Sequence, residues 1–174
     1  MKKGSLKASG ILRIQELGQL EAVSTSNPGQ FTGLILDQLY EHGINVQFAA
    51  EVLAPDSRHL LTLCVEAGEV NRVAGLWEAG KDRLHLESYR TRPEVTVLAV
   101  YGPHFRERPG AACVAYQALI RAGVPVFAIS TSFSAIAFVL DRKDVEKGLD
   151  SLLSAFDLGQ GAVLTAMEGC SKRV

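Results

Sequence analysis

The sequence lacks an excess of charge of either sign. Its 174 residues carry 18 Lys and Arg against 19 Asp and Glu, which gives a formal net charge of -1. Nucleic-acid-binding proteins need a basic stripe or patch that neutralises phosphates, so we do not expect a nucleic-acid partner. With 47% apolar and 21% charged residues, the composition is that of a globular chain that can bury a core.

Long hydrophobic runs are also missing. The most apolar segment, residues 124–140, is interrupted by Pro125 and by Ser and Thr residues, and a membrane-spanning helix needs about 20 mostly apolar residues. We therefore expect a buried β-hairpin there and no membrane partner. Residues 1–7 begin with a basic stretch, but no apolar run of ~7–15 residues follows it, as a signal peptide requires. The cytoplasm is the expected location.

Cysteine and histidine are few and scattered. The three Cys lie far apart without a CxxC pair, which predicts reduced thiols rather than disulfides. The four His show no HxxH or HExxH spacing, so no metal ligands are predicted. No GxSxG, GxxxxGK[ST] or GxGxxG motif is present either. We expect no catalytic residue, metal or cofactor, and we predict that the chain is not an enzyme.

What the sequence does contain is an internal repeat. Residues 20–43 and residues 95–123 each run from a strand rich in β-branched residues, through a Pro-Gly pair and a segment with helical apolar spacing, to a terminal glycine. The Pro-Gly pairs are Pro28-Gly29 and Pro109-Gly110, and the terminal glycines are Gly43 and Gly123. A glycine at the end of a helix favours a left-handed C-cap.

Each copy continues with a hairpin and a second helix. The hairpins are predicted at residues 44–66 and 124–140, and the second helices at residues 70–77 and 145–156. Asp141 is the expected N-cap at the entry to the last helix.

A closing strand is clear only in the first copy, where residues 83–90 supply it. The order is then β-α-β-β-α-β twice, the ferredoxin-like pattern of an α+β fold. Residues 10–16 form an unassigned strand at the front. Residues 161–167 are either the missing strand of the second copy or a tail.

Several motifs in a fixed order carry a resemblance to a known family. They are Ser26-Asn27-Pro28-Gly29 with Gly43-Ile44-Asn45-Val46, YGPHFRERPG at 101–110, AISTS at 128–132 and the predicted helix end AFDL at 155–158. Together they resemble the tandem ACT regulatory region of aspartate kinases, over roughly residues 8–158.

The resemblance implies two ferredoxin-like ACT domains in tandem, with the first inserted into the second. The first would comprise residues 18–91 and the second residues 10–17 plus 92–158, followed by a C-terminal strand or tail at residues 159–174. Residues 10–16 would then close the second sheet. Homodimers with a ligand between ACT units are also implied, and unpaired sheet edges favour dimers too. The kinase domain has no counterpart in this sequence, so phosphoryl transfer is not implied.

A small amino acid is the expected ligand. The first N–H groups of a helix lack partners inside the helix and attract a carboxylate, although the Pro-Gly pairs could serve only to turn the chain. The expected ligand-binding residues are Ser26, Asn27, Gly29, Gln30, Phe31, Asn45, Gln47, Glu51, Ile129, Ser130 and Thr131. Glu51 should meet an ammonium group, so aspartate and glutamate should bind worse than neutral or basic amino acids.

The leading functional prediction is a regulatory, amino-acid-binding protein. It would control a partner such as a biosynthetic enzyme, or act as the free regulatory subunit of an aspartate-kinase-like enzyme. Three positions depart from the family pattern: Ser26 replaces an acidic residue, Glu51-Val52 replaces a Gln-Asn pair and Pro125 replaces an Asn. These departures leave a second hypothesis open, a ligand-free assembly module that holds partners together.

Overall fold

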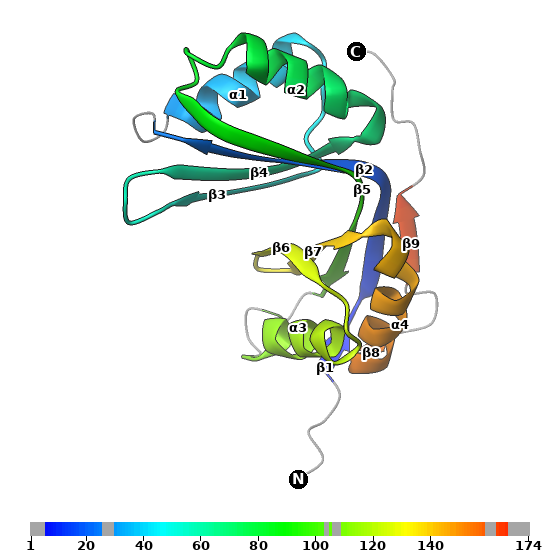
Figure 1. Cartoon of the computed structure of the whole chain (residues 1–174). Coiled ribbons are helices and arrows are strands. Elements are labelled where there is room, and N and C mark those ends of the chain that lie inside the picture. Colours follow the sequence, from blue (N-terminus) through cyan, green and yellow to red (C-terminus); the bar gives the residue numbers. More distant parts are fainter. Residues whose placement is uncertain (1–5, 26–29, 103–104, 106–108, 159–162, 167–174) are drawn as a thin grey trace. The chain divides into compact units, whose positions relative to one another are not determined.

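The computed structural model describes residues 6–25, 30–102, 105, 109–158 and 163–166. The chain divides into two compact units, unit 1 (Met1–Gln15 and Thr96–Val174) and unit 2 (Glu16–Val95). Unit 2 is thus inserted into the sequence of unit 1. Two long strands, β2 (Gly10–Ser24) and β5 (Leu86–Tyr101), contribute residues to both units (Figure 1).

Unit 2 is a four-stranded sheet with two helices on one face (Figure 1). Besides its parts of β2 and β5, its elements are α1 (Gln30–Glu41), β3 (Phe48–Leu53), β4 (His59–Glu66), the 3-10 turn Ala67–Glu69 and α2 (Val70–Ala79). The strand order is β3-β4-β2-β5. The pairs β3–β4 and β2–β4 are antiparallel.

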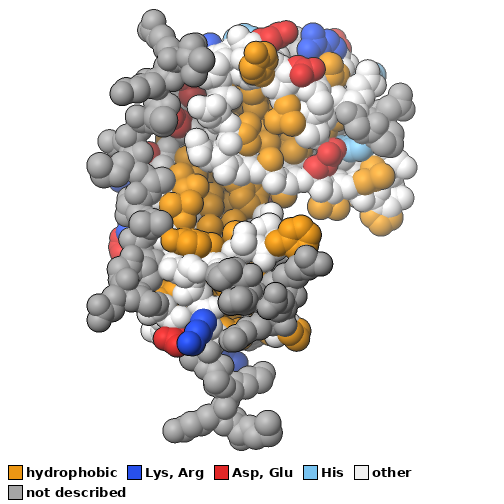
Figure 2. Space-filling model, turned by 180° about the vertical axis from the view of Figure 1, so that it is seen from behind, with side chains coloured by type: hydrophobic (Ala, Val, Ile, Leu, Met, Phe, Trp, Pro, Cys, Tyr) orange, Lys and Arg blue, Asp and Glu red, His pale blue; other side chains and the backbone are white. Residues whose placement is uncertain are grey.

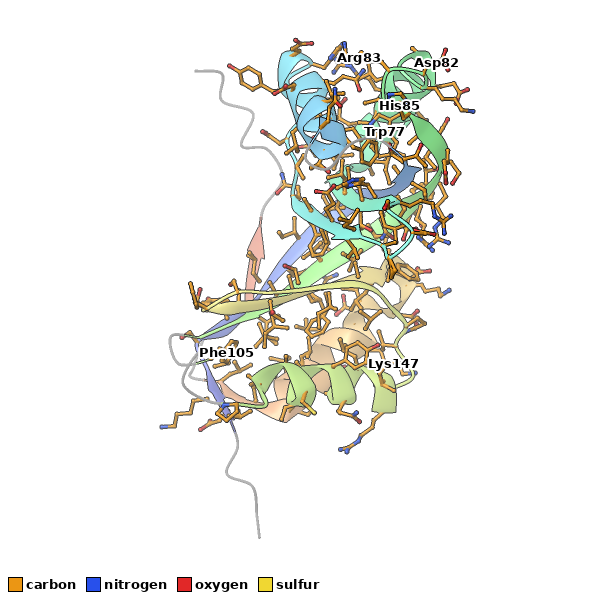
Figure 3. All side chains as sticks on the ribbon, turned by 90° about the vertical axis from the view of Figure 1, so that its left-hand side faces the viewer. Trp77, Asp82, Arg83, His85, Phe105 and Lys147 are labelled. Carbon is orange, nitrogen blue, oxygen red and sulfur yellow. The ribbon has the colours of Figure 1, made fainter. Side chains whose placement is uncertain are left out.

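The helices of unit 2 form because their apolar residues recur every three or four positions and so share one face. That face packs on the sheet and makes the core of the unit. The buried helix residues are Phe31, Ile35, Leu39, Val70, Val73 and Trp77, and they cluster with Leu20, Ala22, Leu61, Leu63 and Val65 of the strands. Trp77, labelled in Figure 3, is fully buried and meets Tyr89 edge-on with the ring centroids 6.0 Å apart.

Unit 1 repeats this arrangement with additional strands. Besides its parts of β2 and β5, it contains β1 (Leu6–Ala8), α3 (Ala111–Arg121), β6 (Val126–Thr131), β7 (Ala135–Asp141), the 3-10 turn Arg142–Asp144, α4 (Val145–Ala155), β8 (Phe156–Leu158) and β9 (Val163–Ala166). The strand order is β2-β5-β7-β6, and β9 adds to β2 in parallel. Strands β1 and β8 pair in parallel as a separate two-stranded sheet. Both helices cover one face of the larger sheet (Figure 1).

The first helix of each unit ends in the same way, as the repeat predicts. Gly43 and Gly123 have φ values of 67° and 66°, in the left-handed region that glycine tolerates. In unit 2 the N–H of Ile44 donates to the carbonyl of Leu39 at 2.9 Å, and an equivalent bond of 3.0 Å closes the helix of unit 1. The predicted left-handed glycine caps are confirmed, and both are Schellman motifs.

Two sequence interpretations of the strands need correction. The predicted strand at residues 10–16 and the one predicted to start at residue 20 form the single strand β2, which ends at Ser24. The predicted strand at residues 83–90 begins only at Leu86 and merges with the one predicted to start at residue 95 into β5. The first apparent break is a bend: Glu16 has a φ of 55°, yet strand pairing continues on both sides of it.

The start and end of the last helix also differ from the sequence interpretation. Asp141 caps the 3-10 turn rather than α4, because its carboxylate accepts from the N–H of Lys143. The helix stops at Ala155, and Phe156 turns into the extended conformation of β8. The Phe156 ring is buried and packs against Phe105, with the ring centroids 6.0 Å apart. Burying this ring in the core of unit 1 accounts for the early end of the helix. Within the described ranges no helix is long and apolar enough to cross a membrane.

Candidate functional site

The connection from β2 to α1 is where a ligand is expected in unit 2. Ser26, Asn27 and Gly29 lie outside the described residues. Gln30 begins α1 and is exposed, whereas the side chain of Phe31 is fully buried. The Phe31 ring therefore belongs to the core, and only its backbone N–H, at the start of the helix, is placed to meet a ligand.

Three more residues of the predicted set lie on or just before β3. Asn45 and Gln47 are exposed, and the backbone N–H of Gln47 donates to the carbonyl of Cys64 at 2.8 Å. That bond places Gln47 directly before the β3–β4 pairing, with its side chain toward solvent. Glu51 lies within β3, the outermost strand in the order of unit 2.

The remaining predicted residues lie in unit 1, on β6. Ile129, Ser130 and Thr131 pair with β7, and Ile129 and Thr131 are exposed while Ser130 is half-buried. The described residues of the predicted set thus form two groups, one in each unit.

Sequence reasoning missed the side chain that contacts Glu51. His59, the first residue of β4, places Nδ1 2.7 Å from Oε1 of Glu51. Strand register explains the contact: Glu51 faces Leu61 and His59 faces Leu53, so both side chains project from the same face of the hairpin, one diagonal step apart. The signal in the sequence was an ionisable residue on each arm of a predicted hairpin.

The two partners differ in exposure. The His59 side chain is 3% exposed, while that of Glu51 is 31% exposed. The His59 ring lies against Phe31 at the start of α1, with the centroids 6.4 Å apart. Its Nε2 atom is buried and has no hydrogen-bond partner in the described part of the chain. Because an ionised carboxylate only accepts hydrogen bonds, the hydrogen shared with Glu51 is assigned to Nδ1 of His59.

A second polar cluster lies on the other face of the same sheet. Glu21 on β2 accepts hydrogen bonds from Arg90 and Arg92 on β5, and Arg92 also donates to Gln19 at 3.1 Å. Burial alone raises the pKa of the Glu21 carboxyl, but the hydrogen bonds and charges of the two Arg side chains outweigh it and lower that pKa. The carboxylate is therefore already satisfied by this chain.

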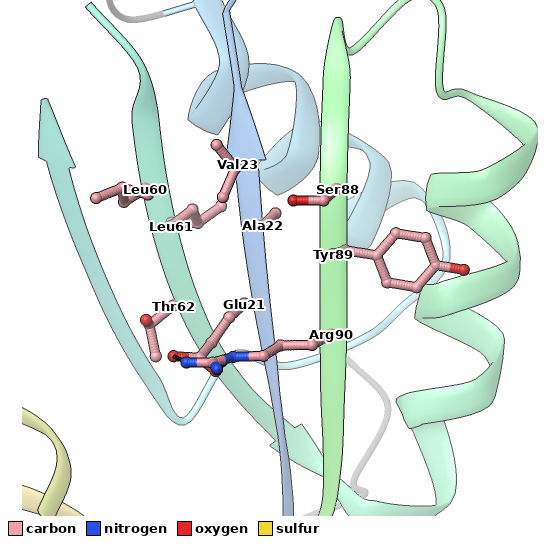
Figure 4. Close-up of a pocket in the computed structure, with 9 residues that line it drawn as sticks. All are labelled: Glu21, Ala22, Val23, Leu60, Leu61, Thr62, Ser88, Tyr89 and Arg90. Carbon is pink, nitrogen blue, oxygen red and sulfur yellow. Dashed lines mark hydrogen bonds and ion pairs between the residues drawn. The ribbon is translucent and has the colours of Figure 1, made fainter. Parts of the chain in front are cut away.

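Glu21 and Arg90 of this cluster border a hollow of about 470 Å³ over the strands of unit 2 (Figure 4). Glu21 and Arg90 reach toward one another from neighbouring strands across it. The other side chains around the hollow include Val23, Leu60, Thr62 and Ser88. The hollow offers apolar surface and a ready-made ion pair, so a ligand there would have to compete with Arg90 for Glu21.

Metal-ligating side chains and thiols could also carry chemistry. Among the described residues, no group of three His, Cys, Asp or Glu side chains could hold a metal ion. Burial raises the pKa of the Cys64 thiol to about 12, and the charge of Glu21 adds to that effect. Cys113 is exposed.

The comparisons with known proteins concern aspartokinases. No protein-family model matches the chain. Aspartokinase 2 of Bacillus subtilis (strain 168) is 24% identical over 126 residues, which cover 72% of this chain and 31% of that protein. This chain therefore spans about a third of the length of the relative.

Solved structures agree with this relation at the level of the fold. The ligand-free regulatory subunit of aspartate kinase from Thermus thermophilus aligns over 86% of this chain and 99% of that one, with a TM-score of 0.77 and 17% identity. E. coli aspartokinase III, solved in complex with lysine and aspartate, aligns over 90% of this chain and 35% of that one, with a TM-score of 0.63 and 12% identity. The chain is therefore similar in sequence to aspartokinases and shares the α+β fold of an aspartate kinase regulatory subunit, which confirms the resemblance found in its motifs.

Proposed function

We propose that this chain is an amino-acid-sensing regulatory protein of the aspartate kinase type, built from two ferredoxin-like ACT domains with the first inserted into the second. The observation that carries the proposal is the fold, because 99% of the Thermus thermophilus regulatory subunit aligns with it. The strand orders β3-β4-β2-β5 in unit 2 and β6-β7-β5-β2 in unit 1, each with two helices on one face, support the two-domain description.

The proposed ligand is a neutral or basic amino acid. Its carboxylate would meet the first N–H groups of α1, which lack partners within the helix. Gln30, Asn45, Gln47 and Glu51 supply polar groups in unit 2. A second carboxylate on the ligand would be repelled by Glu51, so we propose that lysine or threonine binds better than aspartate.

We also propose that the protein is a homodimer. Strands β3 and β6 end the strand order of their units, and unpaired strand edges need cover. The first helix of each unit exposes an apolar pair four residues apart, Leu36 with Tyr40 on α1 and Tyr116 with Ile120 on α3. Figure 2 shows apolar side chains exposed among few charged ones on one face. A second copy of the chain would cover the edge strands and these helices. Sedimentation at micromolar concentration should give a dimer, and a monomer would contradict the proposal.

A regulatory role requires a partner whose activity changes when the ligand binds. The proposed partner is a biosynthetic enzyme, and the similarity to aspartokinases favours the catalytic polypeptide of an aspartate kinase. The cytoplasm, where amino-acid biosynthesis takes place, remains the predicted location.

A thermal-shift screen of the proteinogenic amino acids tests the sensing role. A ligand at 100 times its dissociation constant stabilises the native state by about 2.7 kcal/mol, which corresponds to roughly 5–10 °C for a chain of this size. We expect that shift with at least one neutral or basic amino acid and a smaller one with aspartate. A screen in which no amino acid raises the melting temperature would reject the sensing role and favour the ligand-free assembly module.

A further inference from the structure

We propose that His59 is a positioning residue that holds Glu51 as an ammonium-binding carboxylate, so that unit 2 selects amino acids by charge. The inference rests on the amino-acid-binding role proposed above and identifies the side chains that set the charge of the ligand. His59 is anchored, since its side chain is 3% exposed, whereas that of Glu51 is 31% exposed. The 2.7 Å contact between them therefore joins a fixed group to an accessible one.

The surroundings of His59 restrict its orientation. Its backbone pairs with Ser24 of β2 on one side and Leu53 of β3 on the other. Its ring packs against Phe31, which is fully buried. A side chain enclosed in a close-packed core has few alternative rotamers. The fixed His59 ring consequently holds the Glu51 carboxylate in one direction. No flexible side chain has to become ordered for this contact to form.

The bonding of His59 leaves a negative charge on Glu51. Nδ1 carries the hydrogen that the carboxylate accepts, and Nε2 is buried without a partner within the described ranges. A proton on Nε2 would place an unpaired N–H in the core, which is costly. The geometry thus makes His59 a hydrogen-bond donor to Glu51 through Nδ1 and leaves the second oxygen of the carboxylate for a ligand.

A zwitterion can be held at this end of unit 2. Oε1 of Glu51 is taken by His59, whereas Oε2 has no partner among the described residues, so it remains free for an ammonium group. His59 also contacts the first turn of the 12-residue helix α1 through Phe31. In that same turn Oγ1 of Thr32 is buried and has no hydrogen-bond partner among the residues that the structure describes. The helix start favours a carboxylate and Glu51 favours an ammonium group.

The repeat provides an internal comparison. Counted from the terminal glycine of the first helix, Glu51 corresponds to Thr131 of unit 1. His59 lies seven residues before the end of β4, and Ser134 lies seven residues before the end of β7, so these two residues correspond. Both counterparts are neutral hydroxyl residues, so this charge-selective site occurs in unit 2 alone, and we expect one per chain.

Titration calorimetry of the full chain with L-lysine and L-glutamate tests the inference. Glu51→Gln should weaken lysine binding about tenfold, equivalent to one 1.4 kcal/mol step, and bring the two affinities close together. His59→Leu should reduce the lysine-to-glutamate affinity ratio in the same direction. His59→Asn should preserve most of that ratio, because its amide N–H can replace Nδ1–H. The matched control is Glu69→Gln, which removes the same charge from a carboxylate that is 33% exposed and paired with Arg72.

The outcomes separate the inference from the proposed function. A native protein that binds amino acids with an affinity ratio unchanged by Glu51→Gln and His59→Leu overturns the inference and leaves the sensing role standing. A purely structural His59 would weaken both ligands equally and leave the ratio intact. Two equal sites per chain would also overturn the inference. If the native protein binds no amino acid in the thermal screen, the sensing role and the inference both fail. Circular dichroism checks that His59→Leu folds, and Glu51→Gln changes only a partly exposed surface position.

Discussion

Gly43 and Gly123 occupy equivalent positions in the two units and adopt φ values that differ by a single degree, 67° and 66°. Each closes the first helix of its unit, and the residue that follows it, Ile44 or Val124, is buried. The glycine therefore ends the helix and also returns the chain to the core. This shared geometry makes the two caps a paired test of the repeat.

Alanine at either cap should destabilise the protein. A residue with a Cβ pays roughly 1 kcal/mol to adopt the left-handed conformation, so Gly43→Ala and Gly123→Ala should each lower the free energy of unfolding by about that amount. Chemical denaturation measures it. Gly75→Ala is the control, because Gly75 lies within α2 and a Cβ there meets no atom of the described part of the chain within 4 Å. That variant should be as stable as the native chain or up to about 1 kcal/mol more stable. Equal losses of unfolding free energy in all three variants would show that the left-handed conformation at Gly43 and Gly123 does not require glycine.

The repeat is also the part of the fold that the sequence predicts best. Helical spacing with a terminal glycine is a local pattern, and it located α1 and α3 to within a few residues. The two-residue period does not reveal whether a strand ends or only bends, which is why β2 was divided at Glu16. The short strand β8 was hidden for a different reason, because its pairing with β1 joins residues at opposite ends of the described chain.

The candidate site also depends on strand pairing that local sequence patterns do not reveal. Glu51 could be singled out as a charged residue within the predicted hairpin at residues 44–66, but its partner depends on the register between β3 and β4. A shift of one residue would move every side chain of a strand to the other face. His59 therefore became a site residue only when the pairing was known. Phe31 was chosen for its place after Pro-Gly, and only the structure separates its buried ring from its backbone N–H.

The ion pairs of Glu21 predict a stability that depends on pH. The hydrogen bonds from Arg90 and Arg92 lower the pKa of this carboxyl below its ordinary value, despite the opposing effect of burial. A carboxyl with a lowered pKa in the native state stabilises it above the unfolded value, near pH 4.5, and that contribution is lost as the pH falls through the native pKa. Glu21→Gln should therefore cost about 1–2 kcal/mol at pH 7 and progressively less toward pH 3.

Denaturant unfolding between pH 3 and pH 7 measures this difference. Glu87→Gln serves as the control, since Glu87 is 40% exposed and its contact with Arg58 is 3.7 Å. Such an exposed pair should contribute at most about 0.5 kcal/mol at any pH. A Glu21→Gln penalty that stays constant down to pH 3 would contradict the assigned ion pairs.

Thiol reactivity should differ between Cys64 and Cys113. Burial raises the pKa of the Cys64 thiol to about 12, so almost no thiolate exists at pH 8, and the side chain is also inaccessible. Cys113 is exposed. Iodoacetamide at pH 8 should alkylate Cys113 in the native protein and Cys64 only after denaturation. Peptide mass mapping reads each site separately, and comparable native rates at both would contradict the buried position of Cys64.

Gly18 lies where β2 passes close to the first residue of α2. A Cβ built on Gly18 would clash with Cγ2 of Val70 and lie 3.3 Å from the backbone oxygen of Arg92. Gly18→Ala should therefore cost about 1–3 kcal/mol through overpacking. Val70 is 4% exposed, and Val70→Ala removes its clashing methyl groups. Made alone, this substitution should lower the free energy of unfolding by about 1–2 kcal/mol. In the double variant the new methyl group occupies the space that Val70 vacates, so the loss should be smaller than the sum of the two single losses by about 1 kcal/mol or more. Urea unfolding of the four proteins closes this double-mutant cycle. Strictly additive losses would show that the Val70 side chain is not what requires glycine at position 18.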